Sequence, residues 1–282
     1  MAHGKRRGVW RRFCRHRVAV ACLALLALMM LLALLAPLIA PYAPTKPVGQ
    51  FAQPPGPGHL LGTDKIGRDV LSRNLYAMRV SLFVGLMATL ISTAVGVLLG
   101  LVSGWFGGPA DKAIMGFTDM VMSFPYILLV LVAAAIFQPG LKSIVLILGF
   151  VDWPGVARLV RGNVLSLKET NFAKSDVTAG LPGGYILFSE ILPNTIAPVL
   201  VYATSVFALS ILDEAALSFL GMGVQPPTPS LGNLLNGAES LSVLTGKPWL
   251  WVPAGTTIIL LVVCINFVGD ALRDALDPRN TE

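Results

Sequence analysis

Apolar runs long enough to cross a bilayer dominate this chain. Five are plain, at residues 18–40, 80–106, 113–137, 197–221 and 249–268. A spanning helix needs about 20 mostly apolar residues, because lipid offers no partner to a free backbone N–H or C=O group. The chain is 55% hydrophobic and 13% charged, whereas soluble domains carry about a quarter charged residues. We therefore expect an all-α membrane protein.

A sixth run, 141–160, is weaker because Asp152 and Pro154 interrupt it. Including it gives six transmembrane helices with both termini in the cytoplasm. The inward segments then hold most of the Lys and Arg residues, as the positive-inside rule requires. The expected parts are a basic cytoplasmic N-terminus (1–17), a first transmembrane helix (18–40), an outer loop (41–78), a five-helix core (79–268) that includes a cytoplasmic loop (158–194), and a cytoplasmic tail (269–282).

The basic N-terminus favours retention of the first helix with its start in the cytoplasm. Its cations are Lys5, Arg6, Arg7, Arg11, Arg12, Arg15 and Arg17. Residues 18–40 are longer than the apolar core of a secretory signal, which has about 7–15 residues. Since the basic run abuts this apolar stretch, it is a topology signal, and we expect no nucleic-acid partner.

The outer loop divides into two parts. Pro41 to Gly58 is rich in Pro and Gly and is predicted to be extended. Residues 66–78 have a helical period of apolar positions, which predicts an amphipathic helix on the membrane surface. A simple lead-in to the second span is the alternative.

Catalytic and metal-binding patterns are missing from the sequence. It contains no phosphate-binding G-x-x-x-x-G-K-[ST] loop, no H-E-x-x-H and no G-x-S-x-G. The scattered Cys14, Cys22 and Cys264 indicate neither a disulfide framework nor a metal cluster. We expect no catalysis, no metal and no cofactor in this chain, so uphill transport would need an ion gradient or another subunit.

Four acidic residues fall within or near the apolar runs: Asp119, Asp152, Asp213 and Glu214. Ionisable groups in a membrane are often functional. Capping or pairing inside the bundle is the favoured interpretation. A direct role in solute passage and a proton relay stay open.

Residues 158–194 are too polar for the bilayer and too patterned for a slack linker. Apolar positions, among them Val164 and Phe172, can form one side of a surface helix, and Pro182-Gly183-Gly184 ends it. A second short amphipathic piece, Tyr185 to Leu192, follows. Gly180, without a Cβ, would let another backbone approach closely. A short helix across this face suits docking into a groove of a soluble partner, although a helix that only touches lipid headgroups has the same pattern.

The segment resembles the E-A-A-x-x-x-G-(x)n-I-x-LP loop of bacterial ABC-importer permeases. Here it reads Lys174-Ser175-Asp176-Val177-Thr178-Ala179-Gly180, then Ile191-Leu192-Pro193. From about residue 15 to Arg279, the chain looks like the C-type permease of dipeptide, oligopeptide and nickel importers. Further matches, in chain order, are Leu61-Gly62-Thr63-Asp64, Gly67-Arg68-Asp69-Val70-Leu71-Ser72-Arg73, Arg79-Val80-Ser81-Leu82, Asp119 with Phe124-Pro125, Arg158-x-x-Arg161, Glu214-Ala215, Gln225-Pro226-Pro227, and Gly269-Asp270-Ala271-Leu272-Arg273.

The resemblance implies a multi-pass protein of the bacterial inner membrane with the type I importer fold. It also implies a second homologous permease, two ATP-binding subunits that hold ATP and Mg²⁺, and an extracytoplasmic solute-binding protein. The implied ATPase-coupling residues are Phe172, Lys174, Ser175, Asp176, Gly180, Ile191 and Pro193. The residues implied to face the binding protein are Asp64, Arg68, Asp69, Arg73 and Gln225.

One departure from the pattern is a reversal of charge. Lys174-Ser175-Asp176 stands where the family has Glu-Ala-Ala, so Glu169 or Asp176 could serve in place of the acid. Di- or oligopeptides are the expected solutes. Nickel–chelate import is the nearest alternative within the family, and a gradient-driven carrier is the alternative from another class.

Overall fold

Helices of membrane length form the body of the protein. This computed structural model describes residues 12–276, and in that range five helical segments are long and apolar enough to cross a bilayer. They are α2 (Arg17–Leu34), α4 (Val70–Phe106), α7 (Leu141–Val151) with α8 (Trp153–Lys168), the segment from α10 (Gly183–Tyr185) through the π-helical η1 (Ile186–Ile191) to α11 (Leu192–Phe219), and α14 (Val252–Leu276). The expected all-α fold is confirmed.

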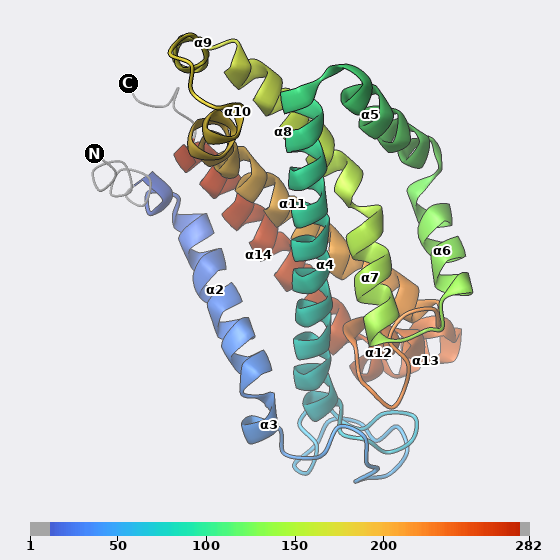
Figure 1. The fold of residues 1–282 in the computed structure, drawn as a ribbon. Coiled ribbons are helices and arrows are strands. Elements are labelled where there is room, and N and C mark those ends of the chain that lie inside the picture. The colour runs from blue at the N-terminus through green and yellow to red at the C-terminus, as the bar shows by residue number, and fades with distance from the viewer. Residues whose placement is uncertain (1–11, 277–282) are drawn as a thin grey trace.

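The sixth crossing is a broken helix. The run 113–137 folds as α5 (Gly108–Ser123) and α6 (Tyr126–Ile136), which are bent by 90°. Pro125 disfavours helical geometry in the residue before it, and Phe124 is extended, with ψ at 141°. Figure 1 shows that α5 and α6 together carry the chain from one end of the bundle to the other. Counted as one crossing, the bent pair brings the candidate spans in the described residues to six.

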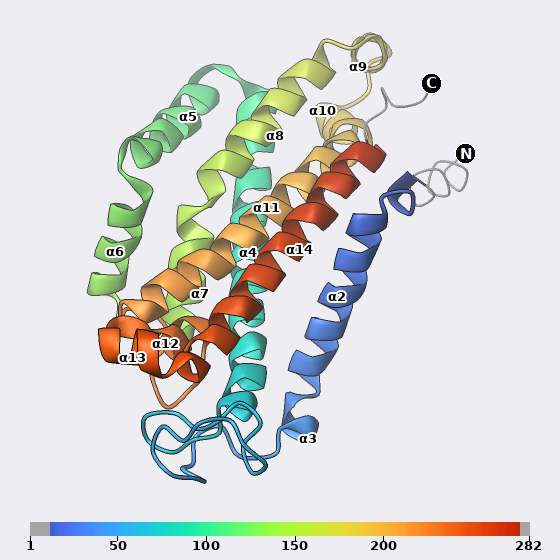
Figure 2. The same cartoon turned by 180° about the vertical axis from the view of Figure 1, so that it is seen from behind.

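The two ends of the bundle differ. Figures 1 and 2 place the start of α2, the end of α14 and α9 (Asn171–Thr178) at one end, here called the α9 end. The opposite end carries α3 (Ala36–Ile39), the loop before α4, α12 (Leu231–Leu235) and α13 (Leu241–Gly246), with short 3₁₀ turns η2 (Asn236–Glu239) and η3 (Pro248–Leu250). This is called the α12 end.

Several expected boundaries are corrected by the structure. No surface helix spans 66–78, because Asp69 caps α4 by accepting the Ser72 N–H at 2.8 Å and the first turns of α4 are buried. The alternative, a lead-in to the span, is right. Residues 141–160 extend without a loop to Lys168, and residues 186–194 belong to η1 and α11. The segment outside the long helices is thus 169–182, much shorter than the expected loop 158–194.

The ends of the chain are partly outside the described residues. The basic residues 1–11 and the last six, 277–282, lie there. Residues 269–276, expected in a tail, continue α14.

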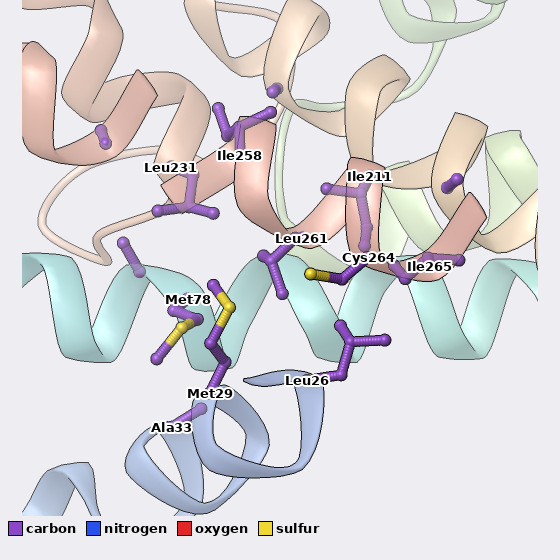
Figure 3. Close-up of a cluster of buried hydrophobic side chains, with 14 of the residues drawn as sticks. Leu26, Met29, Ala33, Met78, Ile211, Leu231, Ile258, Leu261, Cys264 and Ile265 are labelled. Atoms are coloured by element: carbon purple, nitrogen blue, oxygen red, sulfur yellow. The ribbon is translucent and has the colours of Figure 1, made fainter. Parts of the chain in front are cut away.

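The largest apolar cluster joins α2, α4, α11 and α14. Figure 3 shows Leu26 and Met29 of α2 facing Met78 of α4 and Leu261 of α14. Cys264 lies in this cluster as a small buried side chain with a free thiol. The cluster fixes the first helix against the core.

Glycines set the separation of α4 from α8. A Cβ on Gly96, Gly100 or Gly104 would lie 2.5 Å from Val156 Cβ, 2.6 Å from the Ala157 carbonyl oxygen and 2.8 Å from Val164 Cβ, respectively. The spacing of four residues puts the three glycines on one face, as in close-packed membrane helices. Val164, expected on a surface helix, is buried against this face.

The free energy of unfolding of the Gly100→Ala variant is expected to be about 1–3 kcal/mol lower, because the added Cβ would press against backbone, which cannot rotate away. The thermal midpoint in detergent would measure the loss. Gly116→Ala is the matched control, because nothing lies within 4 Å of a Cβ there. Equal midpoints for the two variants would contradict the close packing.

Candidate functional site

The short helix α9 contacts η1 and α8 at the α9 end. Ala173 of α9 is buried, and Phe172 is 39% exposed. A cavity of about 270 Å³ beside α9 is lined by Trp105, Lys168, Ala173, Lys174, Thr178 and Ile186. Side chains from α4, α8, α9 and η1 therefore meet around one small space.

Lys168 ties the end of α8 to the end of α4. Its Nζ donates to the Trp105 carbonyl at 2.8 Å and lies 5.3 Å from the centre of the Trp105 ring. Carbonyls in the last turn of a helix lack partners within the helix and attract cations. Lys168 therefore links the C-terminal ends of α8 and α4.

The coupling residues expected from the sequence fall into two groups. Phe172, Lys174 and Ser175 are exposed on α9, with Asp176 half-buried beside them. Ile191 is buried among the side chains of α8 and α11, and Pro193 lies in the first turn of α11. Ile191 therefore holds η1 against the bundle, and its side chain is not on the surface where α9 lies.

Lys174 has a partner within the chain. Its Nζ lies 2.8 Å from Glu169 Oε2, and both side chains are more than half exposed. The hydrogen bond from the Lys174 ammonium lowers the pKa of the Glu169 carboxyl below its ordinary value. The reversed charge at position 174 is thus balanced by a neighbouring acid.

Gly180 ends the α9 turn. Its φ is +78°, and the Leu181 N–H donates to the Asp176 carbonyl at 3.1 Å, which closes the helix end. Nothing lies within 4 Å of a Cβ built there, so within this chain the glycine is needed for its backbone conformation and leaves open space beside it. A close approach by another backbone stays a prediction.

Glu214 is the centre of a polar cluster inside the bundle. It is fully buried and accepts hydrogen bonds from Ser81 Oγ at 2.5 Å and Ser218 Oγ at 2.7 Å. The same hydroxyls accept the backbone N–H groups of Leu231 and Val224. Glu214 therefore joins α4 and α11 to the segment that leads into α12.

Asp152 and Asp213 lie near one another around Tyr126. The Tyr126 hydroxyl donates to Asp213 Oδ2 at 2.7 Å. Asp152 Oδ2 is buried and has no hydrogen-bond partner among the described residues. A cavity of about 330 Å³ contains Tyr126, Asp152 and Tyr202 in its lining. Hydroxyls and a carboxylate facing a cavity can accept a cationic group.

Asp119 belongs to a separate pair at the surface. Its Oδ1 lies 2.5 Å from Arg158 Nη2, and the two side chains are 64% and 48% exposed. Close to it, Asp111 binds the Arg161 guanidinium through two bonds of 2.6 and 2.7 Å and accepts from Ser103 Oγ. These pairs hold α5 against α4 and α8.

In the sequence alone, Tyr126, Tyr202 and Asp111 have no functional signal, and Ser81 appears only within the family match Arg79-Val80-Ser81-Leu82. Each becomes notable only through a partner far away in the chain. For Tyr126 one local signal exists: the residue follows the Phe124-Pro125 break, where a span is interrupted.

The residues expected to face a binding protein mostly hold the loop before α4 together. Asp64 accepts from Arg68 Nε at 2.7 Å and Arg73 Nη1 at 2.8 Å, while Asp69 accepts from His59 Nδ1 at 2.9 Å. Asp69 and Arg73 are buried, so their side chains are not available to a partner in this conformation. Contact of this loop with a binding protein stays a prediction. Gln225, whose Nε2 donates to the Gly221 carbonyl at 2.7 Å, is partly exposed at the same end.

In residues 12–276, no three His, Cys, Asp or Glu side chains are grouped as a metal site.

Comparison with protein families gives two matches. A model of the "binding-protein-dependent transport system inner membrane component" family matches residues 96–282. A model of the "N-terminal TM domain of oligopeptide transport permease C" matches residues 6–55.

Relatives of similar length exist in several bacteria. The glutathione transport system permease protein GsiD of Pectobacterium atrosepticum is 38% identical over 275 residues, 97% of this chain and 91% of that protein. The dipeptide transport system permease protein DppC of Haemophilus influenzae is 40% identical over 223 residues, 79% and 75% of the two chains. The oligopeptide transport system permease protein OppC of the same species is 40% identical over 223 residues, 79% and 71%.

Solved structures share the fold at low sequence identity. The chain of an inward-facing MetNI methionine ABC transporter has a TM-score of 0.57 and 19% identity, covering 74% of this chain and 97% of that one. A chain of an amino acid ABC transporter also has a TM-score of 0.57, with 13% identity and coverage of 73% and 95%.

Proposed function

Because the chain belongs to the family of binding-protein-dependent transport system inner membrane components, and is a permease subunit of an ABC importer, we propose that it carries di- or oligopeptides. The relatives named for dipeptides, oligopeptides and glutathione support this solute class. The observation that carries the proposal is their similarity along most of the chain. As a multi-pass inner-membrane protein, this subunit forms one wall of the passage.

The partners proposed are a second permease, two ATP-binding subunits and an extracytoplasmic binding protein. The α9 end would lie in the cytoplasm, where α9 meets an ATPase. The α12 end would then face the binding protein. The energy would come from ATP hydrolysed in those subunits, since the sequence lacks a phosphate-binding loop.

The path of coupling is proposed to run from α9 through Lys168 to α4. An ATPase that closes on ATP would move α9, and the contacts of Lys168 with the Trp105 carbonyl and ring support transfer of that motion to α4. The ATPases would make different contacts with two arrangements of the helices. That difference would shift the population between the inward-facing and the outward-facing state.

The cavity at Asp152 is proposed as a contact point for the amino terminus of a passing peptide. Its buried, unpartnered Oδ2 and the Tyr126 and Tyr202 side chains support this role. An ammonium group gains a charge-assisted hydrogen bond there.

Co-purification tests the assembly. The tagged chain, expressed with the proteins of its own importer, should bring ATPase subunits through detergent extraction. The complex in proteoliposomes should take up a labelled dipeptide only with binding protein and ATP. Uptake by the isolated chain driven by an ion gradient would overturn the proposal in favour of a secondary carrier.

The Lys174→Glu variant restores the acid of the family pattern. Its thermal midpoint should be almost unchanged, because the exposed pair with Glu169 contributes little to folding. We expect retained uptake and ATPases that resist removal by salt at least as well as in the unsubstituted complex. Lys174→Gln, which removes the cation without adding an acid, is the control. Loss of uptake in the Glu variant alone would argue against an acid at this contact.

The Asp152→Asn variant should lower dipeptide uptake about tenfold through loss of a charged acceptor. ATPase co-purification should be unchanged. Asp119→Asn, in the exposed pair with Arg158, is the comparison and should have a smaller effect. Equal uptake by both variants would remove Asp152 from the passage.

A further inference from the structure

A largely apolar groove lies between α2 and α4 toward the α12 end. Its volume is about 590 Å³, and its lining includes Met30 and Leu34 of α2 and Tyr76, Arg79, Phe83 and Leu86 of α4. Figures 1 and 2 show α2 at one side of the bundle, with α4 and α14 as its neighbours. The groove is therefore peripheral, away from the cavity at Asp152.

Each helix contributes one stripe of residues to the groove. On α2 the lining residues are 30, 33 and 34, and on α4 they include 76, 79, 80, 83 and 86. These spacings put each set on one helical face. Met30, Leu34, Phe83 and Leu86 are between 47% and 66% exposed, so the groove is open along its length.

Arg79 is the cation at the polar end of this groove. In the described part of the chain it has no hydrogen-bond or ion-pair partner, although other arginines are paired: Arg73 with Asp64, Arg158 with Asp119, and Arg161 with Asp111. From Val80 to Phe106, α4 carries no charge. Arg79 thus stands where the charged start of α4 meets its apolar length, the level expected for lipid headgroups.

We propose that this groove binds one anionic phospholipid. The Arg79 guanidinium would donate two parallel N–H bonds to the phosphate, and Tyr76 would lie at the same interfacial level. An acyl chain would run along Phe83 and Leu86 between the helices. A net negative headgroup supplies the counter-charge that Arg79 lacks, whereas a zwitterionic headgroup brings its own cation.

Lipid retention by the purified importer tests whether the positive charge of Arg79 selects an anionic headgroup. The complex is extracted in mild detergent and exchanged into an equal mixture of phosphatidylglycerol and phosphatidylcholine, and tightly held lipid is measured by native mass spectrometry. Retention of phosphatidylglycerol should fall about tenfold in Arg79→Gln. Lys142→Gln is the matched control, since Lys142 is an exposed cation at the same end that does not line the groove. Equal retention in the two variants would overturn the proposal.

The occupant of the groove is tested by photo-crosslinking. A benzophenone amino acid at Phe83 or Leu86 in the assembled importer should yield a lipid adduct on this chain. Capture of the second permease instead would show that a protein helix fills the groove and would overturn the proposal. Met30→Trp, which fills the space while leaving Arg79 in place, should remove the adduct. Neither result depends on which solute is transported, so failure here leaves the proposed function standing.

Discussion

The Glu214→Ala variant is expected to lose on the order of 3–5 kcal/mol of folding free energy, from a cavity and from two hydroxyls left without their acceptor. Glu214 is fully buried, and its carboxylate holds Ser81 and Ser218, which in turn hold the backbone of Leu231 and Val224. Its removal therefore disconnects α4, α11 and the segment before α12 together. A lower thermal midpoint in detergent and a smaller yield of folded protein would measure the loss.

The Glu214→Gln variant distinguishes the effect of lost hydrogen bonds on stability from the effect of lost side-chain volume. The amide keeps the shape and one acceptor oxygen, so its midpoint should lie between those of the unsubstituted protein and the alanine variant. Ser218→Ala should also fall between them, because it removes one donor and the acceptor of the Val224 N–H. If Glu214→Ala unfolds like the unsubstituted protein but transports nothing, the residue has a role in passage and its structural assignment is wrong.

The Gly180→Arg variant should insert and fold but lose uptake by at least about tenfold, a typical size for coupling between two sites. The backbone at position 180 has φ of +78°, which L-residues rarely adopt, and the space beside it is open in this chain. A long side chain would project into that space, where the ATPase is proposed to close. Uptake of a labelled dipeptide and co-purification of ATPase subunits are the measurements.

The Gly180→Asn variant distinguishes the role of Gly180 in the backbone turn after α9 from its role in the proposed ATPase contact. Asn tolerates a positive φ and is short, so it should preserve the end of α9 and most of the uptake. Loss of uptake in both variants, with ATPases still bound, would mean that only glycine's backbone matters there. Normal uptake in Gly180→Arg would contradict docking at α9.

Much of the fold follows from local sequence. The apolar runs predict the helices. The run 113–137 is predicted as a single span, but in the structure it breaks at Phe124-Pro125. Residues 66–78 do not form a separate surface helix, because 70–78 are the first turns of α4, where α14 and α2 cover Met78. Periodicity shows that a helix has an apolar face but does not show whether lipid or protein covers it.

The candidate site was less predictable. The motif at 174–193 pointed to one continuous loop, but Ile191 packs inside the bundle and only 169–182 lie outside the long helices. The four acidic residues look alike in the sequence but differ in the structure. Glu214 is the buried centre of a polar cluster, and Asp152 lines a cavity. Asp213 accepts a hydrogen bond from Tyr126, and Asp119 pairs with Arg158 at the surface. The partners that make this difference have no local signal.

A helical membrane protein follows from the apolar runs alone, because long apolar segments in lipid must satisfy every backbone hydrogen bond within themselves. Which polar groups meet depends on how the helices pack. Ser81 and Glu214 are 133 positions apart, and Lys168 reaches a carbonyl 63 positions away. Side-chain pairing inside a bundle depends on the rotation and crossing of the helices, which glycine contacts such as those of α4 with α8 fix through packing.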